Sequence, residues 1–285
     1  PLHDDSWTVP VVEAIAVDPA DDDTILVATD GTGVHRSTDG GDTWEIGVGG
    51  SGALSTRSIR FSPGSSSELF VGVSSLAVYR STDGGDSFAS SSEGIAELHL
   101  TSVTANPLDP AELAVSFRGQ NDGGVLTSAD AGASWRVEDV PPTRYSKVEF
   151  SPDGILYAVS DGPTSVAPEG LYRRHGDGSW ESIGPDEGPV FETQLTNVTF
   201  STENPDLIVA GGNDFGVAGN EATIWHTDDG GQTWTKAYEA RPNDSVTDLE
   251  IVADGTDQTM VATVSSTSVA GGVLRSTDGG LTWTD

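Results

Sequence analysis

The sequence predicts an all-β protein built from six copies of one structural unit. An eight-residue phrase, STDGGDTW at Ser37–Trp44, recurs along the whole chain. The aromatic residues that close its six copies stand 44 to 54 residues apart. A repeat period of this length indicates one supersecondary unit stacked many times. The other copies are Ser81–Phe88, Ser128–Trp135, the degenerate Arg173–Trp180, Thr227–Trp234 and Ser276–Trp283.

Each repeat divides into four short β-rich segments, and the aromatic residue of the phrase begins the fourth. The first segments are Val12–Val17, Arg57–Phe61, Ser102–Ala105, Lys147–Phe150, Asn197–Phe200 and Asp248–Val252. The second segments are Ile25–Ala28, Leu69–Val73, Leu113–Phe117, Leu156–Val159, Leu207–Ala210 and Met260–Val264. The third segments are Val34–Arg36, Ala77–Arg80, Val125–Thr127, Leu171–Arg173, Thr223–His226 and Val273–Arg275. Short strands at this spacing, separated by Pro, Gly and Asp turn signals, predict a six-bladed β-propeller of four-stranded antiparallel blades.

A repeat that runs from end to end favours one domain over residues 1–285. The expected blades span approximately residues 11–50, 51–95, 96–140, 141–190, 191–242 and 243–285. A strand at residues 6–10 is a candidate for closing the ring, beside the third strand of the last blade or as an extension of its short fourth strand.

The repeated phrase follows the pattern S/T-x-D-x-G-x-x-W/F. It resembles the Asp-box, or BNR repeat, of sialidases, sortilin-type receptors, some endo-glucanases and photosystem-assembly-factor-like propellers. Each aspartate can accept hydrogen bonds from its own tight turn, and each glycine supplies a positive φ. We therefore expect structural roles, rather than metal-binding or catalytic ones, for Asp39, Asp83, Asp130, Asp229 and Asp278. The degenerate copy lacks the Ser and Asp, so we expect its turn to be looser.

The composition is strongly acidic. Asp and Glu total 45 against 13 Lys and Arg, only two of which are lysines, and the net charge is −32. Concentrated salt would screen the self-repulsion of such a chain, so we favour adaptation to a salt-in halophile over a mildly acidic secreted protein or a cation-binding one. The charge argues against nucleic acid and anionic membranes as partners. The compartment stays open between the extracellular space and the cytoplasm of such a halophile.

Several classes of site are excluded or disfavoured by residue content. The absence of cysteine excludes disulfides, iron–sulfur clusters and thiolate zinc sites. No apolar stretch reaches the roughly 18 residues of a membrane span, and no signal peptide is visible. The run Asp21–Asp23 lacks the spacing of a calcium loop, and the five histidines are dispersed. We expect no metal and no cofactor.

The ligand face of a propeller is usually built from the loops that join strand four to the next strand one and strand two to strand three. The repeated phrase joins strands three and four, so it belongs to the opposite face. The residues predicted to line the ligand face are Arg57, Arg118, Arg144, Asp214 and Asp248. The longest loops there are 161–169, 184–195 and 213–221, and long loops of this kind often carry function.

Two catalytic hypotheses are open. Resemblance to sialidases implies an arginine trio on a carboxylate (Arg57, Arg118, Arg144), a nucleophile pair of Tyr145 with Glu192, and Asp161 as the acid. The Arg-Ile-Pro signature of that family is absent, however, and arginines that pair with the abundant acid explain the same residues. A glycosidase that uses two carboxylates is the second hypothesis, but proximity decides little among 45 acids.

These observations favour a non-catalytic interaction scaffold, expected as a monomer, that recognises a protein or carbohydrate. A photosystem-assembly-like chaperone role is a special case of this hypothesis. The alternative is a sialidase-like or related glycoside hydrolase.

Overall fold

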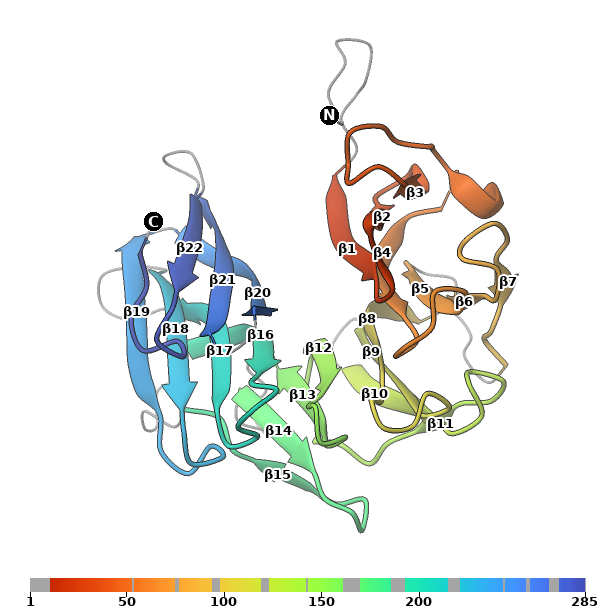
Figure 1. Cartoon of the computed structure of the whole chain (residues 1–285). Coiled ribbons are helices and arrows are strands. Elements are labelled where there is room, and N and C mark those ends of the chain that lie inside the picture. Colours follow the sequence, from red (N-terminus) through yellow and green to blue (C-terminus); the bar gives the residue numbers. More distant parts are fainter. Residues whose placement is uncertain are drawn as a thin grey trace. The chain divides into compact units, whose positions relative to one another are not determined.

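The protein consists of six antiparallel sheets arranged along the chain and almost no helix (Figure 1). The computed structural model describes residues 11–52, 54–74, 77–93, 98–118, 123–141, 143–160, 170–185, 193–214, 221–242, 244–254, 257–266 and 272–284. The predicted fold class, a six-bladed β-propeller of antiparallel blades, is confirmed. The predicted closing strand at residues 6–10 lies outside the described residues. No helix in the described ranges has the length and apolar character needed to cross a membrane.

The chain forms two compact units of three blades each. The first unit contains residues 1–120 and 125–138, and the second contains residues 121–124 and 139–285. Blades of the first unit are β1(Val12–Asp18)–β2(Asp21–Thr29)–β3(Gly33–Ser37), β4(Thr56–Phe61)–β5(Leu69–Val73)–β6(Ala77–Ser81)–β7(Ala89–Ser90) and β8(His99–Ala105)–β9(Leu113–Arg118)–β10(Gly123–Ser128)–β11(Arg136–Val137). A short 3₁₀ turn, η1(Val48–Gly50), follows β3.

Blades of the second unit follow the same order. They are β12(Tyr145–Phe150)–β13(Leu156–Ser160)–β14(Gly170–Arg174)–β15(Trp180–Ser182), β16(Thr193–Phe200)–β17(Ile208–Asp214)–β18(Glu221–Thr227)–β19(Thr235–Pro242) and β20(Asp244–Asp254)–β21(Asp257–Ser266)–β22(Gly272–Ser276). In the first and last blades the fourth strand is reduced to a single bridge, Arg36 with Glu45 and Arg275 with Thr284.

The cores lie between neighbouring sheets. Leu26 and Val34 of the first blade pack with Ile59 and Leu69 of the second, and the other clusters join blades two and three, four and five, and five and six. Every residue of β5 is buried, because a middle strand has a neighbouring sheet on both faces. This explains why the second segment of each repeat is almost continuously apolar.

The repeated phrase forms one tight turn between the third and fourth strands, which we call the repeat turn. In the first copy, Asp39 accepts hydrogen bonds from the Thr43 amide at 2.8 Å and the Thr43 hydroxyl at 2.5 Å. The Ser37 hydroxyl donates to the Asp39 carboxylate at 2.8 Å and accepts from the Gly41 amide at 2.8 Å. The same bonds recur in the turns of Asp83, Asp130, Asp229 and Asp278.

The degenerate copy forms a different turn, which is tighter rather than looser. The His175 amide donates to the Ser179 carbonyl at 2.8 Å, so the hairpin closes within five residues. Asp177 accepts from the Ser179 amide at 2.9 Å and replaces the missing aspartate from a new position. The strand that follows, β15, pairs over three residues, which is more than the two of β7 and β11 but fewer than the five of β19. The expectation of a looser turn was wrong, because the loop is shorter and Asp177 caps it from a different position.

Candidate functional site

All six blades carry a β-bulge at the same place, near the start of the first strand. One residue is skipped in the pairing of strand one with strand two. The skipped residues are Glu13, Arg57, Thr101, Ser146, Thr196 and Thr247. Bulges re-aim side chains and are common next to functional sites. Every skipped residue is polar, so each blade presents a polar side chain at this edge where regular alternation would not place it.

We call this edge of a blade the bulge end, and the opposite edge, which holds the repeat turn, the turn end. The pairing of β4, β5 and β6 places Arg57 and Ser81 at opposite edges of the second blade. The predicted ligand face therefore corresponds to the bulge end. Five of the six predicted first strands began at or after the bulge, as at Asp248 instead of Asp244, because the extra residue interrupts the two-residue alternation.

Charged side chains meet at the bulge end of the first unit. The Arg57 guanidinium donates to the Glu13 carboxylate of the preceding blade, and its second nitrogen lies 3.5 Å from Asp30. Arg57 keeps 35 % of its side chain exposed. In the third blade, Thr101 and Ser102 share the Ser116 hydroxyl at 2.7 and 2.8 Å. The arginine is thus held by two carboxylates but still reaches solvent.

Hydrogen bonds connect the three bulges of the second unit. The Ser146 hydroxyl donates to the Thr196 carbonyl at 3.4 Å, and the Thr196 hydroxyl donates to the Val246 carbonyl at 3.0 Å. A parallel chain runs from the Lys147 ammonium to Asn197 at 2.9 Å and from the Asn197 amide to the Thr247 carbonyl at 2.8 Å. These bonds link blade to blade.

The ammonium of Lys147 also lies close to two carboxylates, 3.9 Å from Glu149 and 4.0 Å from Asp248. Lys147 is largely buried, whereas Asp248 exposes 59 % of its side chain. A ligand at this edge would therefore meet the carboxylate of Asp248 before the ammonium beneath it.

Two acceptor oxygens at this edge are buried without a donor. Asn213 and Asp244 are each 8 % exposed, and Oδ1 of each makes no hydrogen bond within the part of the chain that the structure describes. Asn213 and Asp244 lie on strands that contact each other. Gly211, two residues before Asn213, lies so near Val246, two residues after Asp244, that a Cβ on Gly211 would be 2.7 Å from Val246 Cγ1. The two strands thus pack together, and both orphan acceptors lie toward their bulge ends. A buried acceptor without a donor costs about 1–3 kcal/mol, so a donor that reached either oxygen would recover that cost.

Among the described residues, the carboxylates whose pKa values shift clearly all shift downward. Hydrogen bonds from the Thr or Ser side chain four residues on, from that residue's amide and from the leading Ser or Thr hydroxyl lower the pKa of each repeat-turn aspartate. It falls to about 2 for Asp39, Asp83, Asp130 and Asp229. The pKa values of Asp177, Glu181 and Asp278 are lowered too. A general acid needs the opposite shift.

The structure places the predicted face residues at the expected edge. Arg57 and Asp248 occupy or adjoin bulges, Arg118 ends β9, and Arg144 precedes β12. Asp214 ends β17, where its backbone pairs with Thr193 and Glu221. Arg57 and Arg118 belong to the first unit and Arg144 to the second. Asp161 and Glu192 lie outside the described residues.

Tyr145 is buried, which argues against the proposed role as a nucleophile. Its side chain is fully covered, its hydroxyl donates to the Pro141 carbonyl at 2.8 Å, and its ring meets Tyr172 edge-on at 6.1 Å. Burial raises the pKa of the phenol, whereas a nucleophile must ionise. The sequence could not show this, because Tyr145 stands one residue before the bulge and points into the core.

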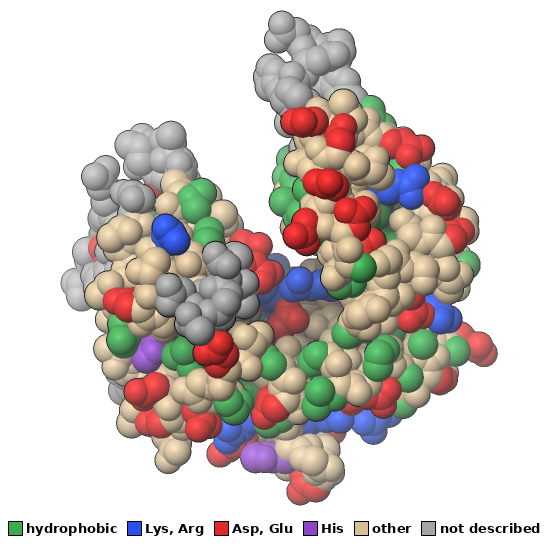
Figure 2. All heavy atoms as spheres, in the orientation of Figure 1, with side chains coloured by type: hydrophobic (Ala, Val, Ile, Leu, Met, Phe, Trp, Pro, Cys, Tyr) green, Lys and Arg blue, Asp and Glu red, His purple; other side chains and the backbone are tan. Residues whose placement is uncertain are grey.

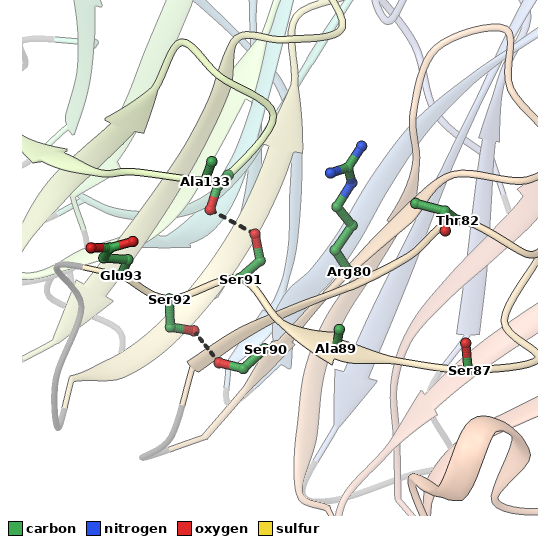
Figure 3. A pocket seen from close by; sticks show the side chains of 10 residues that line it. Arg80, Thr82, Ser87, Ala89, Ser90, Ser91, Ser92, Glu93 and Ala133 are labelled. Atoms are coloured by element: carbon green, nitrogen blue, oxygen red, sulfur yellow. Dashed lines mark hydrogen bonds between the residues drawn. The ribbon is translucent and has the colours of Figure 1, made fainter.

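A pocket of about 360 Å³ lies between blades two and three, near their turn ends (Figure 3). Its walls combine serine hydroxyls with Arg80, Ala89 and Ala133. Ser91 donates to the Gly132 carbonyl at 2.6 Å and so joins the two blades along one wall. Sequence analysis did not single out these residues, although an arginine directly before the phrase is visible at residues 36, 80 and 275.

Acidic side chains are spread over the visible surface and do not gather at one edge (Figure 2). Among the described residues, no three His, Asp or Glu side chains come together as metal ligands would.

Comparison with solved structures gives likeness of fold. An ancestral GH74 enzyme matches with a TM-score of 0.72 and 19 % identity, over 93 % of this chain and 36 % of the other. The GH74 xyloglucanase from Xanthomonas campestris matches with a TM-score of 0.72 and 20 % identity, over 95 % of this chain and 46 % of the other. The chain thus spans less than half the length of these two enzymes.

YCF48 bound to D1 peptide matches with a TM-score of 0.64 and 14 % identity, over 94 % of this chain and 77 % of that one. No family model and no curated protein matches the sequence. Some of these β-propellers are enzymes and one is known with a bound peptide, so likeness of fold does not decide the function. The site must be argued from its own residues.

Proposed function

We propose that this chain is a non-catalytic propeller scaffold of the Asp-box (BNR) class, a single domain over residues 1–285 that binds a protein segment at the bulge end of its blades. The observation that carries the proposal is the pair of orphan acceptors, Asn213 Oδ1 and Asp244 Oδ1, at that edge. A peptide supplies N–H donors along its whole length. The net charge of −32 favours a segment that also carries Lys or Arg.

The remaining bulge-end chemistry supports binding. The threonine and serine hydroxyls and the exposed carboxylate of Asp248 are groups that recognise polar ligands by hydrogen bonds. At the opposite end of the blades, the lowered pKa values of the repeat-turn aspartates fit the structural role proposed for the Asp-box residues. The YCF48 likeness adds support, since a propeller of comparable length is known with a bound peptide.

The experiment is a binding and turnover panel in concentrated KCl. An array of basic, neutral and acidic peptides is probed together with a glycan array and fluorogenic glycosides and sialosides. We expect basic peptides to bind, Asp244→Asn to weaken them, and no glycoside to be hydrolysed. Binding to glycans alone would replace the peptide ligand with a carbohydrate.

The rival proposal is a sialidase-like or related glycoside hydrolase that uses Asp161 and Glu192. Its signature would be turnover that disappears in the Asp161→Asn, Glu192→Gln double variant. Such a result would overturn the scaffold proposal.

We also propose adaptation to high salt, from the excess of 45 acids over 13 bases. Dilution from concentrated KCl should lower the melting temperature strongly, because it removes the screening of self-repulsion. An unchanged melting temperature on dilution would contradict this proposal.

A further inference from the structure

An arginine spans the junction between blades one and two. Arg36 is the last residue before the repeat-turn serine of its blade. Its Nη1 donates to Asp86 at 2.7 Å and to the Gly84 carbonyl at 3.4 Å, both in the repeat turn of the next blade. Its Nη2 donates to Glu45, the bridge partner on its own blade, at 3.0 Å. Two carboxylates therefore neutralise one guanidinium at this junction.

The equivalent arginine recurs between blades four and five. Arg173 Nη1 donates to the Gly230 carbonyl in the next repeat turn at 3.3 Å, and Nη2 donates to Glu181 at 2.8 Å. Strand pairing makes it the counterpart of Arg36, since Glu181 is its partner on the fourth strand as Glu45 is for Arg36. The junction thus has a defined form with an arginine, a fourth-strand carboxylate and a turn carbonyl.

Arg80 holds the same position between blades two and three, but both carboxylates are missing. Its fourth-strand partner is Ala89, where the first blade has Glu45. The fifth residue after the leading serine of the next repeat turn is Ala133, where the second blade has Asp86. Both alanines line the 360 Å³ pocket, so the pocket occupies the place of the two acidic side chains (Figure 3).

Arg80 has a free donor in this pocket. Its Nε and Nη2 donate to Glu68 of its own blade, and its Nη1 makes no hydrogen bond to the described residues. It exposes 36 % of its side chain, compared with 20 % for Arg36 and 28 % for Arg173. Thr82 offers a hydroxyl from the same wall, and Ser90 and Ser92 complete a polar lining.

We propose that this pocket binds a carboxylate-bearing ligand, whose carboxylate takes the place that Glu45 and Asp86 occupy around Arg36. The remainder of the ligand lies against the serine-lined wall. The source of the carboxylate is an acidic amino-acid side chain or an acidic sugar. Glu93 at the rim and the net charge oppose an anion, so we expect weak binding, with a dissociation constant on the order of 1 mM. This site lies at the turn end and is independent of the proposed bulge-end function.

The test is an NMR titration in concentrated KCl with two probes, N-acetylglutamate and glucuronate, and with glucose as the uncharged control. We expect saturable shifts of the Thr82, Ser90 and Ala133 amides with one carboxylate probe and none with glucose. The probe that binds more tightly identifies the source. Absence of saturation with both acids would overturn the proposal.

A matched pair of double variants separates binding from folding. Ala89→Glu with Ala133→Asp copies the first junction, so it should fold, melt no lower than the parent and bind the probe at least tenfold more weakly. Glu45→Ala with Asp86→Ala should create a second carboxylate site beside Arg36. Undiminished binding by the Ala89→Glu, Ala133→Asp variant would show that the probe sits elsewhere and would contradict the assignment.

Discussion

The two ends of each blade use repetition in opposite ways. At the turn end, five copies repeat the residues themselves, and each aspartate has its hydrogen bonds satisfied within eight residues. At the bulge end, the backbone repeats six times but the side chains differ: Glu, Arg, Thr, Ser, Thr and Thr. Uniform chemistry that is satisfied within each turn supports the fold. A uniform backbone that carries varied polar side chains, with the orphan acceptors of Asn213 and Asp244 beside them, is suited to recognition.

The largest effect should come from a glycine at the turn end. Gly231→Ala would force a φ of +89° on alanine and place its Cβ 3.0 Å from Ile183 Cδ1 and 3.1 Å from the Ile183 carbonyl oxygen. We expect a loss of about 2 kcal/mol or more in the free energy of unfolding, measured by denaturant titration in concentrated KCl.

The matched control is Gly176→Ala in the degenerate turn, where nothing lies within 4 Å of the added Cβ. It should leave stability nearly unchanged. If both substitutions lowered the free energy of unfolding equally, the repeat turns would contribute no more to stability than the degenerate turn does.

A smaller effect should follow from Asp39→Ala, which removes the acceptor of the Thr43 amide and hydroxyl bonds. We expect the melting temperature to fall by several degrees. Asp42→Ala, three residues away in the same turn and exposed, should be silent. The comparison between ends fails if the control melts as low as the variant.

Acid should weaken the turn end in a defined window. The folded pKa of Asp83 is about 2, below the value of roughly 3.9 expected in the unfolded chain. A depressed folded pKa gives stability that is present above the unfolded pKa and is lost as the pH falls from about 4 through about 2. Asp83→Asn should flatten this loss in concentrated KCl, where general charge repulsion is screened; an unchanged acid profile would contradict it.

The sequence was sufficient to predict the fold because the turn end depends on local residue identity. Ser37, Asp39 and Gly41 each satisfy the backbone of their own turn, so spacing alone identifies them. The bulge end was harder to predict, because a skipped residue such as Thr196 breaks the alternation that marks a strand, and its hydroxyl partner, the Val246 carbonyl, is 50 residues away.

The same limit applies to the site residues. Strand order predicted on which edge of its blade Arg57 and Asp248 lie, and the role of that edge stays a prediction. The burial of Tyr145 depends on its core neighbours and was not predictable. The absence of the two carboxylates around Arg80 can be recognised only from the strand pairing. That pairing gives Arg80 the partner Ala89, in the position where Arg36 has Glu45.

The most direct test of the account is Asp244→Asn, compared with Asp42→Asn at the turn end. Both variants are assayed for melting temperature and for affinity toward the tightest basic peptide from the array. Asp244 is a buried acceptor without a donor, so we expect its replacement to weaken the peptide at least fivefold while the melting temperature stays equal or rises. A melting temperature several degrees lower with unchanged affinity would give Asp244 a structural role and contradict the assignment of recognition to the bulge end.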